Sequence, residues 1–419
     1  MMSLNIDFKI VGNNRLEYQY DVDDSLKSIL SQDPFFVEYN VDISNVESSI
    51  LCIPFVANLM PIAWNRGINV YCDKLDLNFF NALKVIQHEL NSLYPGEFDK
   101  GKLICNELID NSLKMYDGKK SIVFYSGGVD SYAALIKNIK SNFNCFSVWG
   151  ADIEISEEKR WNDFVKHAES DEVVKNVDKI YCKSNLKDFY NRAELNKFRY
   201  GSWWGRVQHG LGLIALSSPV SMTETYTEVI FGATHTENIK IPWGSTKVMD
   251  ESIKWAQIEV NHEGYELERV DKVKLITNYI KQESLDFNIR VCYSEIYDKF
   301  NCGTCEKCIR TAFNFAMLGI NPNDISIPVQ KGFIKTMLKY SRENFSYTKG
   351  NIYNWQRLTE LANNTPYNII IPLVEKKQYD YIRAGEIIKN MTDNYNKKTW
   401  LKSIYTFYYR VKNYLLRDR

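Results

Sequence analysis

The stretch Ser121-Ile-Val-Phe-Tyr-Ser-Gly-Gly-Val-Asp-Ser131 decides how the middle of this 419-residue chain is interpreted. Its first five residues form an apolar run that predicts a short β-strand, and a helical pattern follows from Asp130 to Ile139. The two glycines let the backbone approach a bound anion and adopt conformations that other residues avoid. Free N–H groups and the dipole of the following helix then favour a phosphate. The sequence therefore predicts a phosphate-binding loop.

Six residues are assigned to this loop, and they differ in their expected roles. Ser126 and Ser131 supply hydroxyl donors, while Asp130 orients the loop or holds a magnesium ion beside the phosphates. The complete set is Ser126, Gly127, Gly128, Val129, Asp130 and Ser131. The alternative is a glycine-rich turn without a ligand, and the position directly between a strand and a helix disfavours it.

Strand-like and helix-like segments alternate after this loop. Residues 144–149, 179–182 and 228–231 are short apolar or alternating runs, and helical or polar segments separate them. This alternation predicts an α/β fold with a doubly wound parallel sheet, in which ligand sites lie at the carboxyl ends of the strands.

Four of the nine cysteines fall within seventeen residues, with the spacing Cys292-x9-Cys302-x2-Cys305-x2-Cys308. Zinc takes four thiolates in a tetrahedral arrangement, and two-residue spacers let neighbouring sulfurs converge on one ion. The pattern predicts a closed, structural zinc site. An iron–sulfur cluster could use the same four thiolates, and free thiols are the third interpretation.

The chain length and pattern changes predict three regions. Residues 1–118 are expected to form an α+β domain with a hairpin over 6–20, and residues 119–325 to form the α/β domain with the metal site. Residues 326–419 are expected to be mainly helical, with Trp400, Ile404, Tyr408, Val411 and Leu415 on one helical face.

The C-terminal region is basic, because eleven Lys and Arg face four Asp and Glu between Lys376 and Arg419. Basic residues interleaved with tyrosines can bind nucleic acid by charge and stacking. A docked helix with a solvated basic face is the favoured interpretation. A nucleic-acid partner is therefore not expected, although this region leaves it open.

The overall composition is that of a folded protein without a dominant charge. Lys plus Arg and Asp plus Glu both number 52, so no global basic field drives nonspecific nucleic-acid binding. The apolar stretches are too short for a bilayer span, and residues 1–30 lack the apolar core of a secretory signal. We expect a cytoplasmic protein without a membrane partner, and a homo-oligomer.

The Ser-Gly-Gly-Val-Asp-Ser motif after a strand resembles the PP-loop of the N-type ATP pyrophosphatases, a superfamily with a HUP-type α/β core. The resemblance implies ATP and Mg²⁺ as cofactors, with Asp130 and Ser131 at the catalytic centre. Members split ATP between the α and β phosphates and adenylate an oxygen of the substrate. A nucleophile, usually an amine or sulfur, then displaces AMP.

The loop together with the four-cysteine pattern resembles the 7-cyano-7-deazaguanine synthase family over roughly residues 119–320. The resemblance implies zinc at the four cysteines and a 7-carboxy-7-deazapurine as the acid, captured by nitrogen to give an amide and then a nitrile. Enzymes of that family are shorter and lack the flanking regions found here. The layout is closer to longer relatives in anti-phage defence operons, some of which are thought to attach a deazapurine to a protein amine.

The resemblance also directs attention to residues near the ends of the predicted strands. Gly150 allows close approach where this fold meets adenosine, with a strand-terminating turn as the alternative. A planar ring could stack on Trp204, and Arg206 could meet a carboxylate or phosphate. The alternative for Trp204 is a core position, because paired tryptophans more often belong to a core than to a ligand site. His235, at the expected sheet edge, is a further substrate candidate, with a structural histidine as the alternative, and Asp250 is a weaker one.

The expected function is thus AMP-forming activation of a carboxylate, followed by capture with ammonia or the amine of a partner protein. One rival is a related enzyme that adenylates another acid for amide ligation or peptide epimerisation. The other is a nucleotide-binding module without catalysis in a defence complex.

Overall fold

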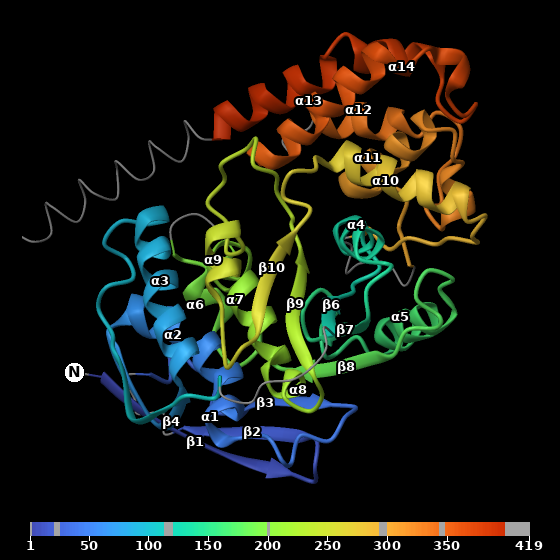
Figure 1. The fold of residues 1–419 in the computed structure, drawn as a ribbon. Helices are drawn as coiled ribbons and strands as arrows, with labels where there is room; N and C mark the ends of the chain where they lie inside the picture. Colours follow the sequence, from blue (N-terminus) through green and yellow to red (C-terminus); the bar gives the residue numbers. More distant parts are fainter. Residues whose placement is uncertain are drawn as a thin grey trace, which may run out of the picture. The chain divides into compact units, whose positions relative to one another are not determined.

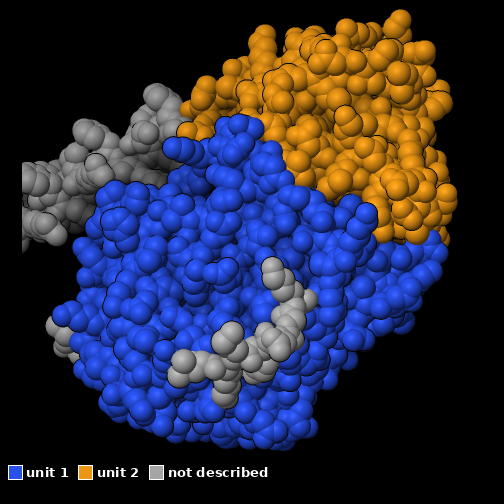
Figure 2. Space-filling model, in the orientation of Figure 1, with its two compact units in different colours: residues 1–266 blue, residues 267–419 orange. Residues whose placement is uncertain are grey.

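The chain folds into two compact units, residues 1–266 and residues 267–419 (Figure 2). The computed structural model describes residues 2–20, 26–112, 120–198, 202–292, 300–342 and 348–398. The helical face predicted over 400–415 lies outside these residues, as does the part of the basic region beyond residue 398.

Unit 1 is built on one ten-stranded sheet in the order β10-β9-β6-β7-β8-β3-β2-β1-β4-β5 (Figure 1). The strands are β1 (Met2–Val11), β2 (Arg15–Tyr20), β3 (Phe35–Tyr39), β4 (Ile68–Asp76), β5 (Leu103–Ile109), β6 (Lys120–Phe124), β7 (Phe143–Trp149), β8 (Lys179–Ser184), β9 (Tyr226–Gly232) and β10 (Glu259–Glu263).

Five neighbouring strands, β10-β9-β6-β7-β8, are parallel throughout, as the sequence predicts. β6 is the central strand of the five. The apolar residues of β6 and those over the first four residues of β7 are buried on both faces, which is typical of a parallel sheet covered by helices. Numbered along the chain from β6, the strand order is 3-2-1-4-5 in one direction across the sheet. The order therefore reverses between β6 and β9, and such switch points open a crevice at the carboxyl ends of the strands.

The remaining strands extend the sheet from β8. β3 pairs antiparallel with β8, with Val37 opposite Ser184, and the β1–β2 hairpin predicted from the sequence continues the sheet. β4 and β5 then follow in parallel with β1. An edge strand exposes unpaired N–H and C=O groups, and β3 satisfies those of β8. The boundary expected after residue 118 consequently falls inside unit 1.

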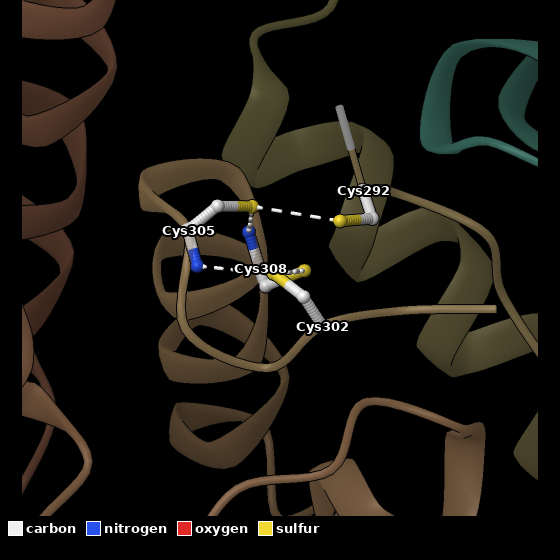
Figure 3. A group of neighbouring side chains, drawn as sticks. All are labelled: Cys292, Cys302, Cys305 and Cys308. Carbon is white, nitrogen blue, oxygen red and sulfur yellow. Dashed lines mark hydrogen bonds between the residues drawn. The ribbon is translucent and has the colours of Figure 1, made fainter. Parts of the chain in front are cut away.

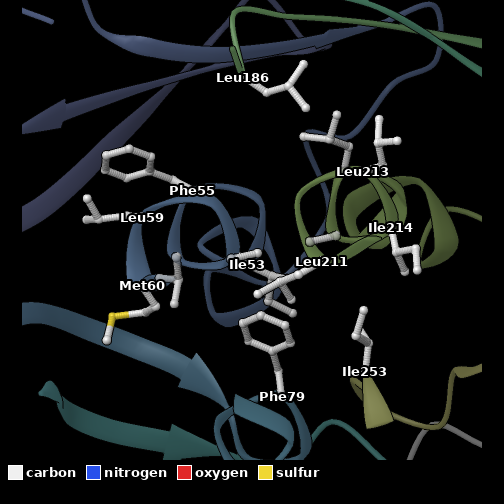
Figure 4. Close-up of a cluster of buried hydrophobic side chains, with 14 of the residues drawn as sticks. Ile53, Phe55, Leu59, Met60, Phe79, Leu186, Leu211, Leu213, Ile214 and Ile253 are labelled. Atoms are coloured by element: carbon white, nitrogen blue, oxygen red, sulfur yellow. The ribbon is translucent and has the colours of Figure 1, made fainter. Parts of the chain in front are cut away.

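The hydrophobic core of unit 1 crosses that expected boundary as well (Figure 4). Ile53, Phe55 and Leu59 of α2 lie in the same buried cluster as Leu211 and Ile214 of α7, two helices separated by about 150 residues of chain. The helices are α1 (Ser48–Leu51), α2 (Ile53–Arg66), α3 (Leu77–Leu93), α4 (Val129–Lys137), α5 (Glu158–Ser170), α6 (Arg192–Leu195), α7 (His209–Ile214), α8 (Ser218–Ser221) and α9 (Lys247–Ser252), with the π-helix η1 (Trp204–Gln208) and the 3₁₀ turn η2 (Ala215–Ser217).

The described part of unit 2 is helical and holds the cysteine group. Its elements are α10 (Arg269–Gln282), α11 (Glu306–Met317), η3 (Pro322–Ile325), α12 (Ile334–Arg342), α13 (Lys349–Asn364), η4 (Tyr367–Ile369) and α14 (Lys376–Arg383). Glu306 joins α11 to α13 by accepting hydrogen bonds from Trp355 Nε1 at 2.9 Å and Asn351 Nδ2 at 3.1 Å. The boundary expected after residue 325 therefore lies within this unit.

Within the described ranges, no helix has the length and apolar character needed to cross a bilayer.

Candidate functional site

The predicted phosphate loop lies between β6 and α4, at the switch point of the parallel strands. Tyr125 still belongs to the ladder, because its N–H donates to Phe146 O at 2.9 Å. Gly127 then has φ +70°, a left-handed conformation that glycine adopts without strain. Gly128 is the N-cap of α4, so the loop leads directly into the N-terminus of that helix. This is the geometry in which free N–H groups favour an anion.

The side chain of Ser131 forms hydrogen bonds with backbone groups of the same loop. Its hydroxyl donates to Gly128 O at 2.9 Å and accepts the N–H groups of Gly128 at 3.2 Å and Ser126 at 3.3 Å. Its side chain is buried, while Ser126 is exposed and Asp130 is half-buried. Ser131 thus shapes the loop, while Ser126, Gly128 and Asp130 are its exposed or partly exposed members.

The carboxyl end of β9 lies against the loop. A Cβ atom on Gly232 would be 2.7 Å from Asp130 O, so only glycine permits this approach. Gly150, at the end of β7, has φ +112°, and a Cβ there would be 1.8 Å from Ser184 O. Glycine is therefore required at residue 150 because the backbone there lies against the end of β8. Gly232 thus brings the end of β9 against the first turn of α4, and Gly150 brings the end of β7 against the end of β8.

A row of aromatic and histidine rings borders the same edge of the sheet. Trp204 of η1 lies 5.3 Å from His209 of α7, and His209 lies 5.4 Å from Trp243. Trp243 in turn lies 5.5 Å from His235, in the segment that follows β9. All four rings are half-buried. His209 is also 6.0 Å from Phe231, the residue before Gly232, so the row reaches the strand end that contacts the phosphate loop.

Glycines make this ring row possible by letting two backbone segments touch. Gly244 N–H donates to Gly205 O at 2.9 Å, and Gly210 N–H donates to Gly244 O at 2.7 Å. A Cβ on Gly205 would be 2.7 Å from the Trp243 ring. The Trp204 segment also adopts a π-helix, a form that is frequent at functional sites. The local sequence is therefore shaped to present Trp204 and Trp243 together.

Two of the four predicted substrate contacts lie together in the row of rings, and the other two lie elsewhere. Trp204 and His235 both belong to the ring row. Arg206 lies beside Tyr94, whose hydroxyl donates to Arg206 O at 3.2 Å; burial raises the pKa of Tyr94, although the Arg206 charge acts in the opposite direction. Asp250 is fully buried, and its Oδ2 accepts Ser245 Oγ at 2.6 Å and contacts His262 Nδ1 at 2.8 Å. Asp250 therefore holds the Trp243 segment in place.

Sequence reasoning did not select three residues that the structure places at this edge. His209 and Trp243 lie in the middle of the ring row, and Trp243 Nε1 is buried without a hydrogen-bond partner among the described residues. Lys187 follows β8, donates to Ala151 O at 2.9 Å and lies 5.5 Å over the Trp204 ring. Each comes from a different segment, so no local spacing connects them; Gly244, directly after Trp243, was the nearest available signal.

The four cysteines of unit 2 converge as their spacing predicts (Figure 3). All four sulfurs lie within 4.8 Å of one another, and the Cys292–Cys305 and Cys302–Cys308 sulfur pairs are each 3.9 Å apart. Zinc–sulfur bonds of about 2.3 Å place the sulfurs of a tetrahedral site about 3.8 Å apart. The group therefore has the dimensions of a four-thiolate metal site.

Short turns around the cysteines create this arrangement. The N–H groups of Cys305 and Cys308 donate to the sulfurs of Cys302 at 3.2 Å and Cys305 at 3.4 Å. Gly303 has φ +70°, and a Cβ there would be 1.8 Å from Pro328 O. N–H donors directed at sulfur stabilise thiolates, which are the form that binds a metal.

Asn301 connects the backbone at Cys292 to the segment that carries the other three cysteines. Its Oδ1 accepts the N–H groups of Val291 at 2.8 Å and Cys292 at 3.1 Å. Its Nδ2 donates to Ile289 O at 2.6 Å and Ser326 O at 2.8 Å. Asn301 is itself buried, so these bonds satisfy both ends of its amide.

Comparison of the chain with protein-family models, with curated proteins and with solved structures finds no match.

Proposed function

We propose that this protein binds ATP with magnesium at the carboxyl edge of β6 and uses it to adenylate a carboxylate, releasing pyrophosphate. The observation that carries the proposal is the position of the Ser126–Ser131 loop. It lies at the switch point of a 3-2-1-4-5 parallel sheet and opens directly into α4. This arrangement supports the resemblance of the motif to the PP-loop of a HUP-type core.

The loop residues have distinct roles in the proposed reaction. N–H groups of the loop and of the first turn of α4 bind the phosphates, and Gly127 and Gly128 let the backbone approach them. Asp130 helps hold the magnesium ion, which offsets the negative charge that develops on pyrophosphate. The substrate carboxylate attacks the α phosphate, so no side-chain nucleophile is required.

The ring row is the proposed site for the acid. Half-buried indoles offer flat faces for a planar heterocycle. Lys187, which lies over Trp204 and 3.7 Å from Glu154 Oε1, places an ammonium group beside the same site. This chemistry suits a 7-carboxy-7-deazapurine. Ammonia then displaces AMP to give an amide, and a second ATP activates the amide oxygen so that it can leave and a nitrile forms. Alternatively, the amine of a partner protein displaces AMP to give a deazapurine–protein conjugate, in the manner of the longer defence-associated relatives.

The four-cysteine group is proposed to hold zinc in a structural role. Four thiolates complete a tetrahedral shell and leave no open position for substrate. Glu306, next to Cys305, binds side chains of α13, so the ion would stabilise the packing of unit 2.

The test is phosphorus NMR of the purified protein with ATP, magnesium, 7-carboxy-7-deazaguanine and ammonium. We expect AMP and pyrophosphate in amounts that depend on the acid, and mass spectrometry then identifies the product. AMP formation that requires a different acid would overturn the deazapurine assignment and leave the adenylation intact. ATP binding without turnover under any acceptor would overturn the enzymatic role.

A further inference from the structure

A group of four polar side chains, three of them buried and one half-buried, lies directly behind the phosphate loop. Tyr125 is the last residue before the loop and Tyr132 the first residue after it. Both hydroxyls donate to the same atom, Asp171 Oδ2, at 2.6 Å each. The two ends of a six-residue loop are therefore attached to one carboxylate oxygen.

That carboxylate is anchored from outside the loop. Asp171 is the C-cap of α5, and its Oδ1 accepts the N–H of Val173 at 3.0 Å. Its side chain is 1% exposed, so it depends on these hydrogen bonds in place of water. Burial also raises the pKa of both tyrosines well above the ordinary value, which keeps them as neutral donors. We call Tyr125, Tyr132 and Asp171 the clamp. The hydrogen bonds of its carboxylate are made to protein groups and need no water.

The fourth member of the group is His167, and a count of hydrogen atoms assigns which of its ring nitrogens carries a hydrogen. Each tyrosine hydroxyl has one hydrogen, and both are used on Asp171. His167 Nε2 lies 3.1 Å from the Tyr125 oxygen and 3.2 Å from the Tyr132 oxygen. Because these oxygens can then only accept, His167 carries a hydrogen on Nε2 and donates it to them. α5 thus contributes both the acceptor and the donor of the group.

We propose that Asp171 is a positioning residue for the phosphate loop: by holding Tyr125 and Tyr132, it fixes the separation of the loop ends and preorganises the loop amides for an anion. The inference rests on the proposed function in that the anion is the triphosphate of ATP. A loop held in its binding conformation loses less conformational entropy when the ligand binds, so the clamp strengthens affinity without touching the ligand.

A purely structural role would lower thermal stability without changing the loop. The control for this is Tyr18→Phe, because Tyr18 is equally buried and donates to Leu51 O at 2.6 Å in the N-terminal part of unit 1. The test variants are Tyr125→Phe and Tyr132→Phe, each of which removes one donor to Asp171 with little change in volume. Asp171→Asn replaces the acceptor itself.

The experiment combines calorimetric titration with Mg–ATP, performed well below the unfolding temperature, and amide hydrogen exchange of the ligand-free proteins. We expect each tyrosine variant to weaken ATP about tenfold, the effect of losing one hydrogen bond to a charged group. Exchange at residues 126–131 should become faster. Tyr18→Phe should leave ATP affinity and loop exchange as in the wild type while lowering the melting temperature.

Variants of Tyr125 and Tyr132 that behave like Tyr18→Phe in both measurements would overturn the clamp. If the wild-type protein does not bind ATP, the proposed function fails, and exchange in the ligand-free proteins still decides the clamp. Faster exchange at residues 126–131 then supports it, and unchanged exchange rejects it.

Discussion

The phosphate loop of unit 1 and the four-cysteine group of unit 2 are both short sequence motifs, but different forces hold them. The loop is held by residues distant in the chain, with Asp171 behind it and Gly232 beside it. The cysteines lie within seventeen residues, and the N–H···S bonds among them join residues two or three positions apart. The loop therefore takes its shape from the surrounding fold, whereas the proposed zinc ion would add stability to the cysteine group.

The largest effect is expected from disrupting the cysteine group. Cys305→Ser removes a thiolate at the centre of the site, so bound metal should fall from about one equivalent to near zero. The stability of unit 2 should fall by at least about 3 kcal/mol, because structural zinc sites contribute on the order of 10 kcal/mol to folding. Elemental analysis and thermal unfolding measure both.

The matched control is Cys105→Ser, a half-buried cysteine on β5 that lies outside the group. It should retain metal in full. A Cys305→Ser protein that still carries one equivalent would contradict the assignment, and visible absorbance of the wild-type protein would indicate an iron–sulfur cluster in place of zinc.

The next effect concerns the ligand of the phosphate loop. Asp130→Ala should reduce the rate of AMP formation by about 100-fold or more, because under the proposed function it would remove a magnesium contact where charge develops in the transition state. Asp163→Ala, on the exposed face of α5, should have no effect. Initial rates of AMP release compare the two, and equal rates would show that Asp130 has no part in catalysis.

A smaller effect, on KM, should distinguish the binding of the acid from the binding of ATP. Trp243→Ala should raise the KM for the acid about tenfold, since stacking of a base on an aromatic ring contributes about 1–3 kcal/mol. The KM for ATP is the internal control and should stay within about twofold of the wild-type value. A rise in both constants would place Trp243 in the support of the loop and not in the acid site.

The smallest effect separates backbone strain from ligand binding. Gly127→Ala and Gly96→Ala both place a side chain at positive φ, +70° and +75°, so each should cost about 1 kcal/mol of stability. Gly96 has open space around it and lies outside the loop, so only Gly127→Ala should also weaken ATP. Parallel unfolding and titration experiments test this, and equal ATP affinities would argue against anion binding at Gly127.

Much of both motifs is predictable from the sequence, because local chemistry encodes them. The strand before Ser126, the helix after it and the left-handed glycine between them depend on neighbouring residues, and the structure confirms this strand–loop–helix unit. The convergence of the four cysteines is also confirmed, since two-residue spacers bring the sulfurs together through short turns. The identities of the ligands remain predictions.

Other features depended on pairings that no local pattern contains. The antiparallel contact of β3 with β8 joins residues about 145 positions apart and merges the N-terminal region into unit 1. The ring row collects Trp204, His209, His235 and Trp243 from separate segments. Asp171 resembles an ordinary helix-terminal acid until the fold places two tyrosines against it.

The sequence by itself determined the elements and the two motifs, because hydrophobic periodicity, glycine conformations and cysteine spacing act over a few residues. Only the tertiary structure decided which strand ends meet, which rings share a surface and what supports the loop. Those contacts follow from burying apolar faces and satisfying strand edges across the whole unit, and the free energy that selects them is a property of the assembled core.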